Sequence, residues 1–152
     1  MEWDDYFLAL CETVALKSKD RSTQLGAVIV GPGHEIRSTG YNGFPRGVND
    51  GIDDRHQRPI KYKWTEHAER NAIYNAARCG VGVLGCTMYC GWLPCTDCAR
   101  GIIGAGITRI CVGTAEMPGR WANDMRVASM MLDEARVLIR CGGAYVPWKT
   151  LL

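Results

Sequence analysis

The sequence predicts a single α/β domain over residues 1–152, with three layers in which helices cover both faces of a mixed sheet of about five strands. Two patterns predict this class. Apolar residues near the N-terminus recur at a helical spacing of about 3.6 residues, and later segments alternate between strand-like and helix-like patterns. The length agrees, because 152 residues, 47% of them hydrophobic, can bury one substantial core.

The N-terminal third predicts a helix followed by a hairpin. The helix is expected to end around Lys19, and its apolar face holds Phe7, Leu10, Cys11, Val14 and Ala15. Segments 25–31 and 35–42 are strand-like, and Pro32-Gly33-His34 between them favours a turn. Two antiparallel strands are therefore expected.

Residues 43–64 are rich in Gly, Asp, Arg and Pro and show neither period. Loops of this length inside a compact domain are usually functional, so this loop is expected to border an active site. After it the patterns predict a helix at 66–79, a strand at 86–92, a short helix at 95–105 and a strand at 108–113. A strand, helix, strand series implies a parallel crossover.

The C-terminal part predicts a last helix at about 123–135, with Met125, Ala128, Met131 and Leu132 on one side. A closing strand is supplied by either of two segments, VLIRC at 137–141 or AYVPW at 144–148. With these elements the sheet has about five strands.

Charge and composition exclude several classes of function. The net charge of +2, from 18 basic and 16 acidic residues, is too even for a protein that coats nucleic acid. No stretch approaches the roughly 20 apolar residues of a membrane span, and the first residues carry acids where a signal peptide carries positive charge. We expect a soluble, cytoplasmic protein without a membrane or stable nucleic-acid partner. Among eight cysteines, the close pair Cys95 and Cys98 favours metal or redox chemistry over disulfides.

His67, Cys95 and Cys98 are residue types that bind zinc. Three protein ligands leave a fourth position for water, whose pKa zinc lowers to about 7, so this pattern indicates a catalytic ion. Glu69 can reach that water if the metal lies beyond the N-terminus of the helix that begins near His67. Pro94 suits the first turn of the next helix and would bring both cysteines to its positive end, which favours thiolates.

The alternative is a closed structural site with Cys86 or Cys90 as the fourth ligand. Glu69 argues against it, because a closed site has no use for a carboxylate beside its ligands. Strand alternation places Cys86, Met88 and Cys90 on one face, where they are expected to be core residues.

The segments H-A-E at 67–69 and P-C-T-D-C at 94–98 match the H-x-E…P-C-x-x-C signature of zinc deaminases that act on nucleobases. From about residue 15 to 113 the chain resembles the deoxycytidylate deaminases of the cytidine deaminase superfamily. The resemblance also includes QLGAVIV at 24–30, GYNGFPRGV at 40–48, GCTMYC at 85–90 and CARGIIGAGITRI at 98–110. It implies a cytidine-deaminase-like fold and the hydrolysis of dCMP to dUMP and ammonia, in support of thymidylate synthesis.

The same resemblance implies residue roles. One catalytic Zn²⁺ would be held by His67, Cys95 and Cys98, while Glu69 takes the water proton, protonates N3 of cytosine and helps ammonia leave. The substrate contacts that it implies are the Ala68 N–H to the pyrimidine carbonyl, Asn42 to the sugar and Trp92 beside the base. Only one zinc is expected, because residues 43–64 hold only His56 where some relatives bind a second ion. Homo-oligomers, common in the superfamily, are expected here.

The residues that bind the 5′-phosphate are left open by the motifs. Arg21 and Ser22 of the DRST segment are candidates, and Arg46 in the loop is another. The loop also has a weak basic character from Arg55, Arg58, Lys61 and Lys63.

Three other functions remain. In the first, the enzyme deaminates another free nucleotide. In the second, it deaminates a flipped base in a polynucleotide, which would require a basic stripe or an aromatic stacking platform. The third is a non-catalytic zinc module. The segment GYNG followed by Pro favours the free-nucleotide branch, so the expected partner is a small deoxynucleotide monophosphate.

Overall fold

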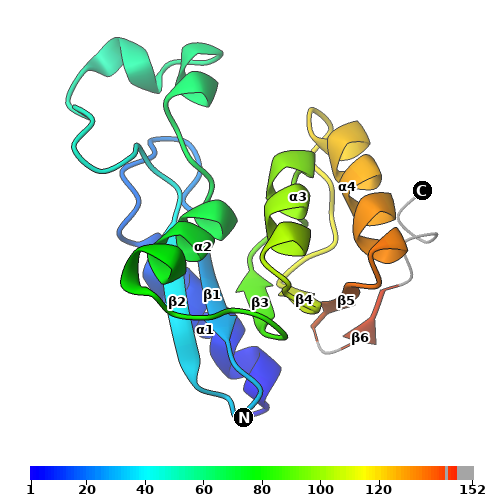
Figure 1. Cartoon of the computed structure of the whole chain (residues 1–152). Helices are drawn as coiled ribbons and strands as arrows, with labels where there is room; N and C mark the ends of the chain where they lie inside the picture. Colours follow the sequence, from blue (N-terminus) through cyan, green and yellow to red (C-terminus); the bar gives the residue numbers. More distant parts are fainter. Residues whose placement is uncertain (143, 147–152) are drawn as a thin grey trace.

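The computed structural model describes residues 1–142 and 144–146, and it confirms the three-layer α/β/α class (Figure 1). A mixed sheet lies between α1 on one face and α2, α3 and α4 on the other. The helices are α1 (Trp3–Ala15), α2 (Ala68–Cys79), α3 (Thr96–Gly104) and α4 (Ala122–Glu134). None of the described helices is long and apolar enough to cross a membrane.

The sheet has six strands in the order β2-β1-β3-β4-β5-β6, close to the expected number of about five. They are β1 (Gly26–Val30), β2 (Ile36–Tyr41), β3 (Thr87–Cys90), β4 (Arg109–Val112), β5 (Leu138–Cys141) and β6 (Ala144–Tyr145). Both segments considered for the closing strand contribute one, which accounts for the extra strand; residues 147 and 148 lie outside the described part.

Strand directions place the functional segments together. β1 pairs antiparallel with β2 and with β3, whereas β3, β4 and β5 are parallel and β6 is antiparallel to β5. The predicted hairpin and the predicted parallel crossover are thus confirmed. The chain before β1 and the chain after β2, β3 and β4 all leave the sheet at the same edge.

Helix α1 ends at Ala15, earlier than the expected Lys19. The Ser18 hydroxyl donates to the backbone carbonyl of Asn42 at 2.7 Å, which turns the chain toward the sheet edge. The long loop, expected to be irregular, contains two short 3-10 helices, η1 (Asp53–His56) and η2 (Ile60–Lys63). Figure 1 shows both projecting beyond the sheet.

Two cores hold the layers together. Phe7 and Cys11 of α1 pack with Val28, Tyr89 and Cys111 on one face. The larger core lies on the opposite face, under α2, α3 and α4, and includes Ala27, Ile29, Met88, Ile110, Ile102 and Leu132. Cys86, Met88 and Cys90 all belong to this larger core and are at most 2% exposed, which confirms their predicted core role.

The contact between β2 and α2 depends on a missing side chain. A Cβ atom on Gly40 of β2 would lie 2.2 Å from the Ala72 nitrogen and 2.4 Å from the Ala68 oxygen. Both atoms are backbone, so they cannot move without displacing α2. Because Ala68 opens α2, Gly40 sets how closely the helix that follows His67 lies on the sheet.

Gly40→Ala is therefore expected to destabilise the fold by about 1–3 kcal/mol or more through overpacking. Denaturant unfolding would measure the loss as a lower midpoint. Gly104→Ala is the matched control, because a Cβ at this helical position meets nothing within 4 Å. It should be neutral or stabilising, since Ala favours helix over Gly. Equal effects of the two changes would contradict this account of Gly40.

Candidate active site

His67, Cys95 and Cys98 converge at one point, as predicted. The His67 Nδ1 atom lies 3.4 Å from the Cys95 Sγ and 3.6 Å from the Cys98 Sγ, and all three ligand atoms lie within 4.8 Å of one another. A tetrahedral zinc ion with ordinary Zn–N and Zn–S bonds would separate these atoms by about 3.6 Å. The donor set therefore fits zinc in chemistry and in spacing.

The described residues give no fourth cysteine to this group. Cys90 directs its Sγ to the Trp92 carbonyl oxygen at 3.3 Å, and Cys86 lies in the apolar core. The candidate metal-binding group found in residues 1–142 and 144–146 contains only His67, Cys95 and Cys98. This geometry favours the open, catalytic arrangement over the closed structural one.

Two helix N-termini carry the ligands. His67 is the N-cap residue of α2 and Cys95 that of α3, and neither makes a side-chain capping hydrogen bond. Asp124 of α4 caps the start of α3 instead: it accepts hydrogen bonds from the Thr96 N–H and the Thr96 hydroxyl, both at 2.8 Å. The positive ends of both helices thus face the ligands and favour anionic side chains there.

The two thiols are electrically unequal. The hydrogen bond from Cys98 lowers the pKa of Cys95 to about 4, against the effect of burial, and His67 adds to the lowering. The hydrogen bond with Cys95 and burial raise the pKa of Cys98. The pKa of His67 is raised to about 9 by the hydrogen bond between His67 and Cys95. Metal ligation requires both thiolates and a neutral imidazole, so binding a cation at neutral pH would release the protons of Cys98 and His67.

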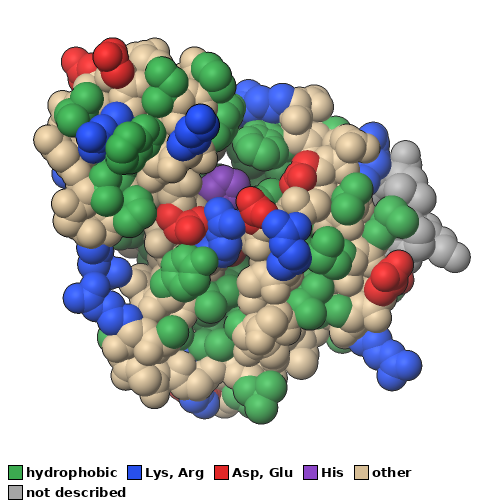
Figure 2. All heavy atoms as spheres, turned by 45° about the horizontal axis from the view of Figure 1, so that its top comes forward, with side chains coloured by type: hydrophobic (Ala, Val, Ile, Leu, Met, Phe, Trp, Pro, Cys, Tyr) green, Lys and Arg blue, Asp and Glu red, His purple; other side chains and the backbone are tan. Residues whose placement is uncertain are grey.

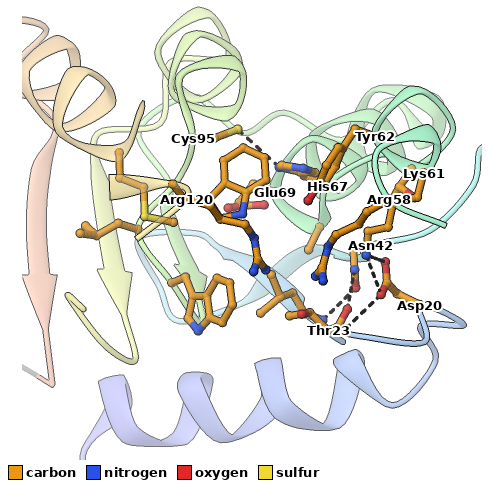
Figure 3. A pocket seen from close by; sticks show the side chains of 17 residues that line it. Asp20, Thr23, Asn42, Arg58, Lys61, Tyr62, His67, Glu69, Cys95 and Arg120 are labelled. Atoms are coloured by element: carbon orange, nitrogen blue, oxygen red, sulfur yellow. Dashed lines mark hydrogen bonds and ion pairs between the residues drawn. The ribbon is translucent and has the colours of Figure 1, made fainter. Parts of the chain in front are cut away.

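Glu69 lies in the first turn of α2, 7% exposed, and its side chain lines the same pocket as His67 and Cys95 (Figure 3). Burial raises the pKa of its carboxyl group, and the charge of His67 opposes this shift. A raised pKa means that the carboxyl group holds a proton more readily, which suits a group that has to take a proton and return it. The expected convergence of the first-turn side chains is what the structure shows.

A pocket opens over these residues. Figure 2 shows a histidine side chain at the floor of a hollow, with acidic and basic side chains around it. The pocket is lined by Asn42 and by residues from four stretches that meet at the sheet edge: 20–25, 58–69, 92–95 and 120–125. Trp121 contacts Tyr62 and His67 edge-on, with ring centroids 5.7 and 6.2 Å apart, and forms an aromatic wall.

The predicted substrate contacts Asn42, Ala68 and Trp92 all line this pocket. Asn42 is held firmly, because its Oδ1 accepts from the Leu25 N–H and its Nδ2 donates to the Thr23 carbonyl oxygen, both at 2.8 Å. Ala68 is the first residue of α2, where a backbone N–H has no acceptor within the helix. The long loop also borders the pocket, as expected, through Arg58, Lys61 and Tyr62.

Two of the predicted phosphate residues do not reach the pocket. Asp20 Oδ1 accepts from the N–H groups of Ser22 and Thr23, and this turn leaves Arg21 exposed and paired with Asp53 at 2.6 Å. Arg46 instead donates to the Asn75 side chain of α2 at 2.8 Å.

Ser22 takes an intermediate place. Its hydroxyl oxygen accepts from the Lys61 ammonium at 2.7 Å and from the Arg58 guanidinium at 3.3 Å. Ser22 itself is not among the residues that line the pocket, whereas Arg58 and Lys61 are. Its hydroxyl therefore lies behind two basic side chains of the pocket wall.

Sequence reasoning missed Arg120, Trp121 and Tyr62 as pocket residues. They belong to segments without a motif or a clear period, so nothing marked them. The basic residues of the loop were a weak signal for Arg58 and Lys61, and both line the pocket.

A buried ion pair fixes one wall. The Lys61 ammonium lies 2.9 Å from Asp20 Oδ2, and the two side chains are only 9% and 7% exposed. Burial alone would raise the pKa of Asp20, but hydrogen bonds from Lys61 and from the Thr23 and Ser22 N–H groups lower it to about 2. This pair ties the chain before β1 to η2.

The fold and the site together define a class of protein. An α/β/α domain with a His, Cys, Cys donor group at two helix starts, and a buried carboxyl group beside it, is the arrangement of the hydrolytic nucleobase deaminases. Comparisons with known proteins agree. A family model described as the cytidine and deoxycytidylate deaminase zinc-binding region matches residues 1–114.

The chain is 39% identical over 138 residues to an uncharacterized deaminase in the luxG 3′ region of Aliivibrio fischeri. The matched residues cover 90% of each chain. It is 40% identical over 115 residues to deoxycytidylate deaminase of Mus musculus, covering 72% of this chain and 64% of that protein. The dCMP deaminase of cyanophage S-TIM5, solved with dCMP and dUMP, has a TM-score of 0.74 at 22% identity, over 90% of this chain and 94% of that one. The last likeness concerns the fold.

The chain belongs to the cytidine and deoxycytidylate deaminase family defined by this zinc-binding region. It is accordingly an enzyme, a hydrolase that acts on C–N bonds.

Lys61→Met is expected to cost about 3–5 kcal/mol of stability, because it leaves the Asp20 carboxylate buried without its cation. Urea unfolding at neutral pH would measure this loss. The double variant Asp20→Asn, Lys61→Met should recover part of it, since no unpaired charge then remains. Lys19→Met is the matched control, because the Lys19–Asp50 pair is 72% and 38% exposed and should contribute less than about 1 kcal/mol. A cost for Lys61→Met no larger than that control would contradict the role of the pair.

Proposed function

We propose that the protein is a zinc-dependent dCMP deaminase, which hydrolyses dCMP to dUMP and ammonia. The observation that carries the proposal is the convergence of His67, Cys95 and Cys98 at the floor of a pocket that also holds the buried Glu69. The relatives from mouse and human are named deoxycytidylate deaminase, at 40% and 39% identity. These relatives support the choice of substrate, and the site supports the chemistry.

One zinc ion would be held by His67, Cys95 and Cys98. When bound, zinc lowers the pKa of a water molecule in its open position to about 7 and so supplies the nucleophile for C4 of cytosine. The helix N-termini at which His67 and Cys95 lie favour the two thiolates that this ion requires.

Glu69 would move the protons. Its carboxylate accepts the proton of the attacking water and delivers it to N3 of the ring, which keeps it in the product. Glu69 then takes the remaining hydroxyl proton from C4 and gives it to the exocyclic amine, which leaves as ammonia. One water is consumed and one ammonia is released. The buried carboxyl group with its raised pKa suits both transfers.

The remaining pocket residues would orient the nucleotide. The Ala68 N–H, at the start of α2, would donate to the pyrimidine carbonyl. The Asn42 amide, fixed by Thr23 and Leu25, keeps one N–H and one lone pair for the deoxyribose. Trp92 and Trp121 provide flat apolar surface for the base.

The proposal carries three further expectations from the sequence. The dUMP product would serve thymidylate synthesis, the enzyme would act in the cytoplasm, and the chain would assemble as a homo-oligomer.

Glu69→Gln is expected to keep stoichiometric zinc, because all three ligands remain, while kcat falls by about 10²-fold or more for want of a proton carrier. Metal analysis and ammonia release from dCMP, made on the same preparation, measure the two properties. Cys95→Ser is the comparison variant and should lose zinc and activity together. Full activity in Glu69→Gln would rule out this role for the carboxyl group, and loss of its zinc would show that Glu69 acts in metal binding.

The substrate is tested by ammonia release from dCMP, CMP, dCTP, deoxycytidine, dAMP and a cytosine-containing oligonucleotide. The highest kcat/KM is expected for dCMP, because the relatives that support the proposal carry that name. A higher value for another substrate would keep the zinc chemistry and overturn the choice of dCMP. No reaction with any of them, despite bound zinc, would favour a non-catalytic module.

A further inference from the structure

Two arginines reach the pocket from distant parts of the chain. Arg58 lies just before η2 and Arg120 just before α4, and Figure 3 shows both side chains extending into the pocket. Both residues are exposed. Arg58 donates to the Ser22 hydroxyl at 3.3 Å. Within residues 1–142 and 144–146, neither guanidinium group forms an ion pair with a carboxylate.

Two other basic side chains near this pocket are paired with carboxylates. Lys61 is paired with Asp20 at 2.9 Å and Arg21 with Asp53 at 2.6 Å. Glu69 lies beside His67 and Cys95 at the metal centre. Away from the metal centre, the charged lining side chains without a paired opposite charge are Arg58 and Arg120, with one positive charge each.

That surplus matches one ligand group. A phosphate monoester carries a charge of about −1.5 to −2 at pH 7. Planar guanidinium groups bind phosphate oxygens through paired N–H donors, with more geometric specificity than an ammonium group. Two such groups from two sides of one pocket can contact different oxygens of the same phosphate.

We propose that Arg58 and Arg120 together clamp the 5′-phosphate of the substrate, and so select nucleoside 5′-monophosphates over nucleosides. This deepens the proposed function and rests on it for the identity of the base. Ser22, a phosphate candidate from its sequence position, then acts indirectly by holding Arg58. Arg120 lies beyond residue 114, so the part of the chain that the family model does not match supplies half of the clamp.

The test uses Arg58→Gln and Arg120→Gln in the full-length, zinc-loaded protein, with calorimetric Kd values for dUMP and deoxyuridine. Each substitution is expected to weaken dUMP binding about 10- to 100-fold, the usual effect of losing a hydrogen bond to a charged group. Deoxyuridine, which has no phosphate, should bind each variant as it binds the original protein. The dUMP affinity should also fall steeply with added salt in the original protein and less steeply in the variants.

Arg21→Gln and Arg46→Gln are the matched controls, because each removes one positive charge from an arginine already bound to another side chain outside the pocket. They should leave the dUMP affinity unchanged. Equal losses for dUMP and deoxyuridine, or losses in the controls as large as in the clamp variants, would overturn the proposal. These binding measurements do not involve turnover, so the two proposals can fail separately. If the clamp variants lose dUMP affinity but the original protein does not deaminate dCMP, the proposed function is wrong and the clamp stands. If the original protein deaminates dCMP efficiently and both clamp variants keep its KM, the clamp is wrong and the proposed function stands.

Discussion

The site depends on the directions in which four strands run. Gly26 of β1 pairs with Tyr41 of β2, and Ala27 of β1 pairs with Cys90 of β3, both antiparallel; Cys90 in turn pairs with Val112 of β4 in parallel. The start of β1 and the ends of the other three strands therefore lie side by side. Every segment that lines the pocket connects to this edge or to a helix that starts there. Residues about a hundred positions apart thus meet without any local sequence signal.

At that edge, the residues at two helix starts serve the site rather than cap the helices, which lowers the stability of the fold. N-cap positions favour Ser, Thr, Asp or Asn, whose side chains contribute about 1 kcal/mol by bonding free N–H groups. Here His67 and Cys95 occupy these positions and make no capping bond. Asp124 offsets the loss at α3, and the Glu66 carboxylate, which accepts from the His67 N–H at 2.9 Å, does so before α2. A metal ion held by both N-cap residues would tie the two helices together.

Sequence patterns predicted the fold class, the helices and the metal group because each rests on local spacing. The apolar period locates α1, and the spacing of Cys95 and Cys98 brings two sulfurs to one helix start. The pattern failed where a residue's position depends on distant contacts. Arg21 follows Asp20 directly, yet the turn that Asp20 makes leaves Arg21 outside and brings Lys61, about forty residues later, to the buried carboxylate. Arg120 had no signal, because its place follows from where β4 ends and α4 begins.

This division separates the reaction from the choice of substrate. The metal ligands and Glu69 lie at the starts of α2 and α3, and α2 packs on the sheet so closely that Gly40 admits no side chain. Arg58 and Arg120 lie in connecting segments, where a change of residue disturbs few packed neighbours. Family membership therefore indicates the C–N hydrolysis closely, because the residues for this reaction lie on packed helices. In the proposed clamp, charges on loops select the group at the far end of the substrate, so a chain with the same metal centre and other residues at 58 and 120 is expected to accept a different nucleotide or nucleoside.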